Sequence, residues 1–215
     1  MKKIRVLFLI GGAFILFLVS LPAYAHVPKA FQGVTPKYIG LGEYEISDGW
    51  TVSVYQKVVP NANAPVIKAA CSIDQGIYGT VLKIYLEADD PKGEMAKIAT
   101  TVDQVAYGHY PTDFVMLKPE YRKHFTGYIQ WNTWSSRATS MPEGNYVTAR
   151  VAVGDKAGLW SNEFVFRFTF QSGVVPAPNP PAPFDQRELP KLGNVFVNLF
   201  NPYHMGGGGG GGDHR

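Results

Sequence analysis

In this 215-residue chain, the side chains best suited to catalysis, metal binding or ligand binding are five histidines, one cysteine and a group of aromatic residues. The histidines stand at positions 26, 109, 124, 204 and 214, so none has the close spacing of a zinc-binding HExxH helix. The chain also contains no GxSxG nucleophile elbow, and scattered Ser, His and Asp residues are common in chains of this size. We therefore predict no catalytic residues, no metal and no cofactor.

His26 supports one competing hypothesis, an enzyme that uses copper. Cleavage after Ala25 would leave His26 with a free α-amino group beside its imidazole, and copper(II) favours such nitrogen ligands. The arrangement resembles the histidine brace of lytic polysaccharide monooxygenases, which are also immunoglobulin-like sandwiches. That resemblance implies a second histidine, for which His109 and His124 are the candidates. The residues after His26 do not match the family's N-terminal pattern, so this reading is the alternative.

Aromatic residues between positions 107 and 134 offer a candidate binding surface. Alternation along residues 125–131 directs Trp131 to one face of a strand and Tyr128 to the other. Tyr128 and Trp134, with Tyr107 and Tyr110 in the preceding loop, form a candidate platform for a sugar ring or a protein partner. The competing interpretation is that these rings simply cover the edge of a sheet.

Cys71 is the only cysteine, so no intrachain disulfide can form. The stretch Val66–Ser72 alternates as a strand, and this pattern places Cys71 on the same face as Ile67 and Ala69. We expect a buried, unreactive thiol; pairing with another molecule is the alternative.

The elements that must position these residues are predicted to be strands. Short alternating runs separated by Gly, Pro, Asn and Asp dominate after residue 25, which indicates an all-β protein. Residues 43–47 and 50–55 form a hairpin around Asp48-Gly49. Residues 106–124 are expected to be a long connection. The strongest core pattern is four aromatic residues at a period of two, namely Phe164, Phe166, Phe168 and Phe170.

Two stretches resemble the immunoglobulin-like or fibronectin III- and cadherin-like modules of bacterial envelope proteins. Residues 86–93 are similar to the strand–turn–strand of those modules, and residues 142–162 to their final hairpin. The resemblance implies an immunoglobulin-like β-sandwich that binds, spaces or assembles, without implying an activity. Cadherin-like modules also bind calcium, but Asp89, Asp90 and Asp155 are expected here as turn residues.

Residues 1–25 have the pattern of a cleavable bacterial signal peptide. Lys2, Lys3 and Arg5 precede an apolar run that ends at Pro22 and the small-x-small triplet Ala23-Tyr24-Ala25. These three basic residues account for the whole net charge of +3, so the remaining chain is neutral with histidine uncharged. We therefore expect export to the periplasm, cell surface or medium, no membrane span after cleavage, and no nucleic-acid partner.

The C-terminal part follows a Pro-rich linker over residues 173–190. Residues 191–215 comprise an apolar segment and a glycine-rich tail that is expected to be disordered. The apolar segment could add a strand to a sheet edge of its own chain or of a neighbour. Its proposed docking residues are Val195, Phe196, Val197, Leu199 and Phe200.

The sequence thus predicts five parts: a signal peptide (1–25), a β-hairpin extension (26–64), an immunoglobulin-like sandwich (65–172), the Pro-rich linker (173–190) and the tail (191–215). The predicted function is an exported envelope or extracellular structural or interaction module without catalytic activity, with a protein partner or self-assembly. The alternatives are the copper enzyme and a carbohydrate-binding module.

Overall fold

The computed structural model describes residues 62–173, 179–185 and 188–203 with their side chains, and the backbone of strands at 37–40, 43–47 and 50–55. The predicted signal peptide, His26 and the glycine run lie outside the described residues. Within the described part, no helix is long and apolar enough to cross a membrane.

The predicted all-β class is confirmed, because the described elements are strands apart from a single 3-10 turn at Pro119–Tyr121. The strands are β1 (Lys37–Gly40), β2 (Glu43–Ser47), β3 (Trp50–Tyr55), β4 (Val66–Ile73), β5 (Gln75–Gly76), β6 (Val81–Asp89), β7 (Met95–Gln104), β8 (Gly108–His109), β9 (Asp113–Met116), β10 (His124–Asn132), β11 (Tyr146–Asp155), β12 (Glu163–Phe170) and β13 (Lys191–Val195).

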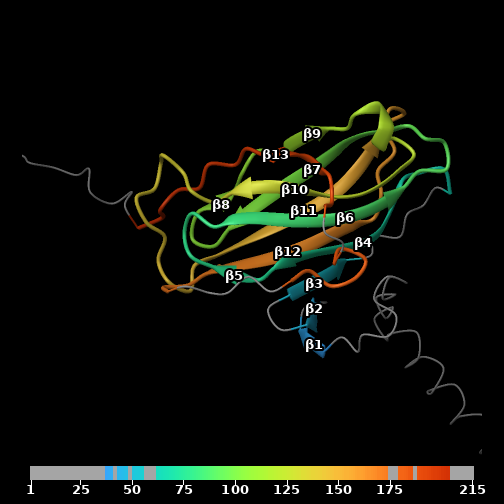
Figure 1. Cartoon of the computed structure of the whole chain (residues 1–215). Helices are drawn as coiled ribbons and strands as arrows, with labels where there is room; N and C mark the ends of the chain where they lie inside the picture. Colours follow the sequence, from blue (N-terminus) through green and yellow to red (C-terminus); the bar gives the residue numbers. More distant parts are fainter. Residues whose placement is uncertain are drawn as a thin grey trace, which may run out of the picture.

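Two mixed sheets, which do not close into a barrel, build the molecule (Figure 1). The first sheet has the order β1-β2-β3-β12-β11-β7, with β8 and β9 beside β7 and β5 beside β12. The second has the order β4-β6-β10-β13, and two residue pairs between β3 and β4 join the sheets. The arrangement is consistent with a β-sandwich. The predicted hairpin is present as β2 and β3, and β3 continues the first sheet by pairing with β12.

One hydrophobic core lies between the sheets. As predicted, the four alternating phenylalanines of β12 are at most 2% exposed, and the alternating residues of β6 are buried as well. Removing one such side chain from water stabilises the fold by roughly 1.5–3 kcal/mol. The largest buried ring is that of Trp131 in β10.

The connection predicted for residues 106–124 contains more structure than expected. It holds β8, the edge strand β9 and the 3-10 turn. β9 is antiparallel to β7, with Val115 opposite Ile98 in the core. The prediction was wrong here because four residues are too few to display a clear alternation.

Residues 179–185 and 188–203 form what we call the belt. Its Pro-rich part lies against the outer face of the second sheet, where the fully buried Phe184 ring is 5.6 Å from the ring of Tyr85. The chain then enters β13, which pairs in parallel with β10 and extends the second sheet (Figure 1). The described Pro-rich residues therefore pack on the sheet and are not a free spacer.

Cys71 is buried as expected, but on a different face. A bulge at Lys68 shifts the register of β4, so Ile67 lies opposite Ala88 while Cys71 lies opposite Tyr85. Ala88 faces the core and Tyr85 the outer side, because successive residues of β6 alternate. The expected shared face with Ile67 was therefore wrong. Burial raises the pKa of the Cys71 thiol well above its usual value.

Candidate functional site

The four aromatic residues predicted as a platform do not form one surface. Tyr110 is only 4% exposed, so it cannot belong to an exposed platform. Tyr128 lies on the outer face of β10, whereas Trp134 follows the end of that strand and is 56% exposed. Among the described residues, no ring contact joins Tyr128 or Trp134 to Tyr107 or Tyr110.

Tyr107 and Tyr110 instead receive the end of the belt. The ring of Phe200 stacks on Tyr107, with centroids 4.8 Å apart and planes 9° from parallel. Tyr107 in turn stacks on Tyr110 at 4.8 Å, and the guanidinium carbon of Arg137 lies 5.0 Å from the centre of the Phe200 ring. This aromatic cluster holds the C-terminal segment against the end of the first sheet.

Hydrogen bonds reinforce the same contact. The Tyr110 hydroxyl donates to Gln104 Oε1 (2.5 Å) and accepts from the Phe200 backbone N–H (2.9 Å). Gln104 Nε2 donates to the carbonyl of Phe200 (2.8 Å), and Trp131 Nε1 donates to the carbonyl of Val197 (3.0 Å). Burial raises the pKa of Tyr110 to about 12, although the bond from Phe200 acts in the opposite direction.

The predicted docking residues lie on their own chain. Val195, Val197 and Leu199 are buried at 4%, 6% and 0% exposure, and Phe200 is half-buried in the aromatic cluster. Phe196 points the other way and is 77% exposed. The sequence left open whether this segment docks on its own chain or on a neighbouring molecule, and in the structure it docks on its own chain.

An exposed apolar patch lies over the first sheet, and the sequence reading missed it. Phe114 and Met116 of β9 are 48% and 67% exposed, and Trp160 is 39% exposed. The Lys97 ammonium lies 4.9 Å from the centre of the Phe114 ring and 5.1 Å from that of Trp160. We call Lys97, Phe114, Met116 and Trp160 the β9 patch.

Local sequence explains the position of Trp160. Gly154 lies beneath its ring, and a Cβ there would come within 2.8 Å of the ring carbon Cζ3. Glycine therefore lets the indole lie flat over β11. The signal available in the sequence was the pair Phe114 and Met116 two residues apart, which by itself does not separate an inward face from an outward one.

Among the described strands, β9 forms a ladder with β7 alone, and at its first residue the Asp113 carboxylate accepts a hydrogen bond from the Phe196 backbone N–H of the belt (3.0 Å). Leu117 N donates to the carbonyl of Ala96 (2.8 Å), so Leu117 and Ala96 are a hydrogen-bonded pair of the ladder between β9 and β7. In an antiparallel ladder every second residue bonds outward, so the backbone groups of Phe114 and Met116 point away from β7. Exposed apolar edges of this kind favour pairing with another chain.

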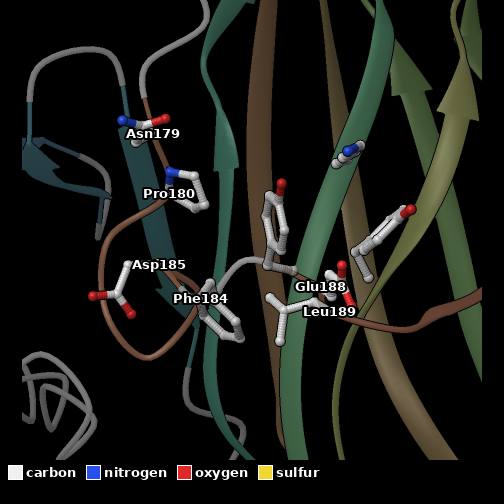
Figure 2. Close-up of a pocket in the computed structure, with 9 residues that line it drawn as sticks. Asn179, Pro180, Phe184, Asp185, Glu188 and Leu189 are labelled. Atoms are coloured by element: carbon white, nitrogen blue, oxygen red, sulfur yellow. The ribbon is translucent and has the colours of Figure 1, made fainter.

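A pocket of about 580 Å³ lies on the opposite sheet, beneath the belt (Figure 2). Tyr85 and Tyr128 come from β6 and β10, and the other wall comes from the belt. Figure 2 shows Phe184 and Leu189 in front of the strands of the sheet, with Asn179 and Pro180 at the beginning of the adjoining loop and Asp185 within its curve. The remaining lining residues are Lys83, Pro180 and Glu188.

The histidines proposed for copper lie at opposite ends of β7. His109 Nδ1 is 2.9 Å from Asp103 Oδ1, near the end of β7. His124 contacts Asp89 and lies two residues after Arg122, whose carbonyl accepts from the Met95 N–H at the start of β7 (3.0 Å). Eight residues of strand separate these ends, about 26 Å, so at most one of the two histidines could serve beside His26, which lies outside the described residues. No group of three or more His, Cys, Asp or Glu residues in the described part could hold a metal.

Two of the three acidic residues weighed for calcium act in turns. Asp90 accepts backbone N–H bonds from Lys92 (2.9 Å) and Glu94 (2.7 Å), and Asp155 accepts one from Leu159 (2.7 Å). Asp89 contacts Lys68 and His124. The bonds of Asp90 and Asp155 are those expected of Asp at the start of a turn. Asp89 instead ends β6 and pairs with two side chains, so its expected role in the turn was wrong.

Comparisons of the chain with protein-family models, curated proteins and solved structures find no match.

Proposed function

We propose that the chain is an exported, immunoglobulin-like interaction module of the cell envelope or extracellular space, without catalytic activity, that binds an extended protein segment at β9. The observation that carries this proposal is the β9 patch beside a strand edge that forms no ladder with any other described strand. Export rests on the signal-peptide pattern of residues 1–25.

The strand order supports the immunoglobulin-like part of the proposal. Seven strands follow the order β4-β6-β10 in one sheet and β12-β11-β7-β9 in the other. In chain order, the first, second and fifth strands therefore face the seventh, sixth, third and fourth. This arrangement resembles that of fibronectin III modules, and the turns between β6 and β7 and between β11 and β12 coincide with the two motifs found in the sequence.

The chemistry of the β9 patch specifies the partner. The outward N–H groups of Phe114 and Met116 would donate to an added strand and their carbonyls would accept from it, as in other cases of strand addition. Its side chains beside β9 would be apolar and would bury the exposed surfaces of Phe114, Met116 and Trp160. The ammonium of Lys97 between the rings favours an acidic side chain at the centre of that segment.

Site-specific photocrosslinking in the producing cell tests this proposal. A photoreactive residue at position 116 should give a discrete adduct with one envelope protein, and Lys97→Glu should reduce that adduct several-fold. The matched control is position 77, since Ile77 is a 44% exposed apolar residue outside the β9 patch. Equal adducts at 116 and 77, or none at 116, would contradict binding at β9.

Export has its own test. Cell fractionation should recover the protein outside the cytoplasm, and N-terminal sequencing should read from His26. Recovery of the uncleaved chain in the cytoplasm would refute the export proposal. Copper titration of the same mature protein then tests the competing enzyme hypothesis, which requires tight, stoichiometric binding.

A further inference from the structure

The pocket beneath the belt has an aromatic floor. Tyr85 and Tyr128 are directly opposite each other in β6 and β10, and their ring centroids are 5.7 Å apart at 53°. Phe184 closes one side by packing on Tyr85 at 5.6 Å. The floor is thus built on two paired strands, which hold it more rigidly than a loop would.

Polar side chains surround this floor. Lys83 shares the outer face of β6 with Tyr85, and its ammonium lies 4.7 Å from the centre of the Tyr128 ring. Asn179, Asp185 and Glu188 contribute an amide and two carboxylates from the belt, and all three are exposed. The pocket therefore offers donors and acceptors around two phenol rings.

These groups narrow the class of ligand. An apolar ligand would remove Lys83 and the carboxylates from water without replacing their hydrogen bonds, which is costly. An anion would meet Asp185 and Glu188, and a cation would meet Lys83. A neutral molecule with an apolar face and many hydroxyl groups satisfies both the rings and the polar rim, and the pocket's volume lies in the range of small-molecule sites.

We propose that this pocket binds a neutral mono- or disaccharide, with the pyranose C–H face on the tyrosine floor at Tyr128 and its hydroxyls bonded to Lys83 and Glu188. The site is separate from the β9 patch: it lies on the other sheet and uses other residues. Failure of the crosslinking experiment therefore leaves this proposal unaffected, and the reverse also holds.

Saturation-transfer NMR on the full mature protein tests the proposal, with maltose, cellobiose and diacetylchitobiose as neutral probes and digalacturonate as an anionic one. At least one neutral probe should receive saturation, and labelled backbone amides at Lys83, Tyr128 and Glu188 should shift on its addition. No saturation of any neutral probe, tighter binding of digalacturonate, or shifts confined to the β9 patch would overturn it.

Substitutions of pocket residues test where the ligand binds. Tyr128→Ala should weaken titrated binding of the positive probe about tenfold or more, the loss expected when a stacked ring is removed. Lys83→Ala should also weaken it, and because Lys83 is exposed this variant does not depend on how the fold tolerates the loss of Tyr128. The matched control is Trp134→Ala, an exposed aromatic residue outside the pocket, which should bind as the wild type does. Unchanged binding in both pocket variants would refute the site.

Discussion

At the residue scale, the hydroxyl of Tyr110 connects the middle of the chain to the end of the belt. It joins Gln104, at the end of β7, to the backbone of Phe200 near the C-terminus of the belt. The bond spans 90 residues of sequence, and the side chain is buried. A buried hydroxyl with two partners is costly to remove, because both partners then lose a hydrogen bond away from water.

Tyr110→Phe should therefore destabilise the protein by about 1–3 kcal/mol while retaining the ring stack with Tyr107. The measurement is the free energy of unfolding from urea titration. Tyr203→Phe is the control, since Tyr203 is 70% exposed and its loss should change stability little. Equal stabilities for the two variants would show that the Tyr110 bonds contribute nothing.

The raised pKa of Tyr110, about 12, predicts a pH dependence of stability. The folded state favours the protonated phenol, so the unfolded chain releases this proton first, near the usual tyrosine pKa of about 10. The contribution of the Tyr110 phenol to the free energy of unfolding is complete below pH 10 and is lost as the pH rises through 12. Stability should fall less steeply between pH 10 and 12 in Tyr110→Phe than in the wild type, as measured by urea titration at each pH. Cys71 and Tyr85, whose pKa values are also raised, are common to both proteins. Identical slopes would contradict the assignment to Tyr110.

At the element scale, β13 fits its place because two glycines leave room for it. A Cβ on Gly193 would come within 2.3 Å of Val115 Cγ1, and a Cβ on Gly127 within 2.6 Å of the Pro190 carbonyl oxygen. The first contact lies between β13 and β9, and the second lies where the belt meets β10. Both approaches are closer than any side chain permits, so neither glycine is replaceable without displacing the strand.

Gly193→Ala should cost about 1–3 kcal/mol, the usual range for overpacking a core. Thermal unfolding by circular dichroism provides the measurement. Asn194→Ala is the matched control, because the neighbouring residue of the same strand is exposed. A Gly193→Ala protein as stable as Asn194→Ala would mean that β13 does not lie against Val115.

At the scale of the whole molecule, the belt completes the core. The belt contributes four buried side chains, those of Leu192, Val195, Val197 and Leu199. The carbonyl of Val197 accepts a hydrogen bond from the indole N–H, which is the only polar group of the buried Trp131 side chain. Phe184 covers Tyr85 on the other side of the same sheet. The part of the chain that the sequence presented as an appendage is thus integral to the fold.

Truncation tests this integration. Ending the chain after Pro190 should remove several core residues, at about 2–5 kcal/mol for each large aliphatic side chain, and should leave a protein that is unfolded or barely folded. Tryptophan fluorescence and thermal unfolding report the change. Ending it after Tyr203 is the control, because every described residue is then retained. If both truncated proteins melt at the same temperature as the full chain, the belt is not part of the core.

The sequence by itself determined the class of fold and the inward faces of the long strands. Alternation is a local property, so Phe164–Phe170 and Leu82–Ala88 could be assigned without knowing their neighbours. The turns marked by Gly and Asp could also be predicted, because the preference for these residues depends on the backbone geometry of only a few neighbouring residues.

Only the tertiary structure decided the rest. A bulge at Lys68 turned Cys71 to the outer face, the return of the belt buried Tyr110, and the short strand β9 placed Phe114 and Met116 beside Trp160. Each depends on a register or a pairing between residues far apart in the chain. A one-residue shift reverses every face of a strand, and local periodicity carries no information about such shifts or about which edge a distant segment covers.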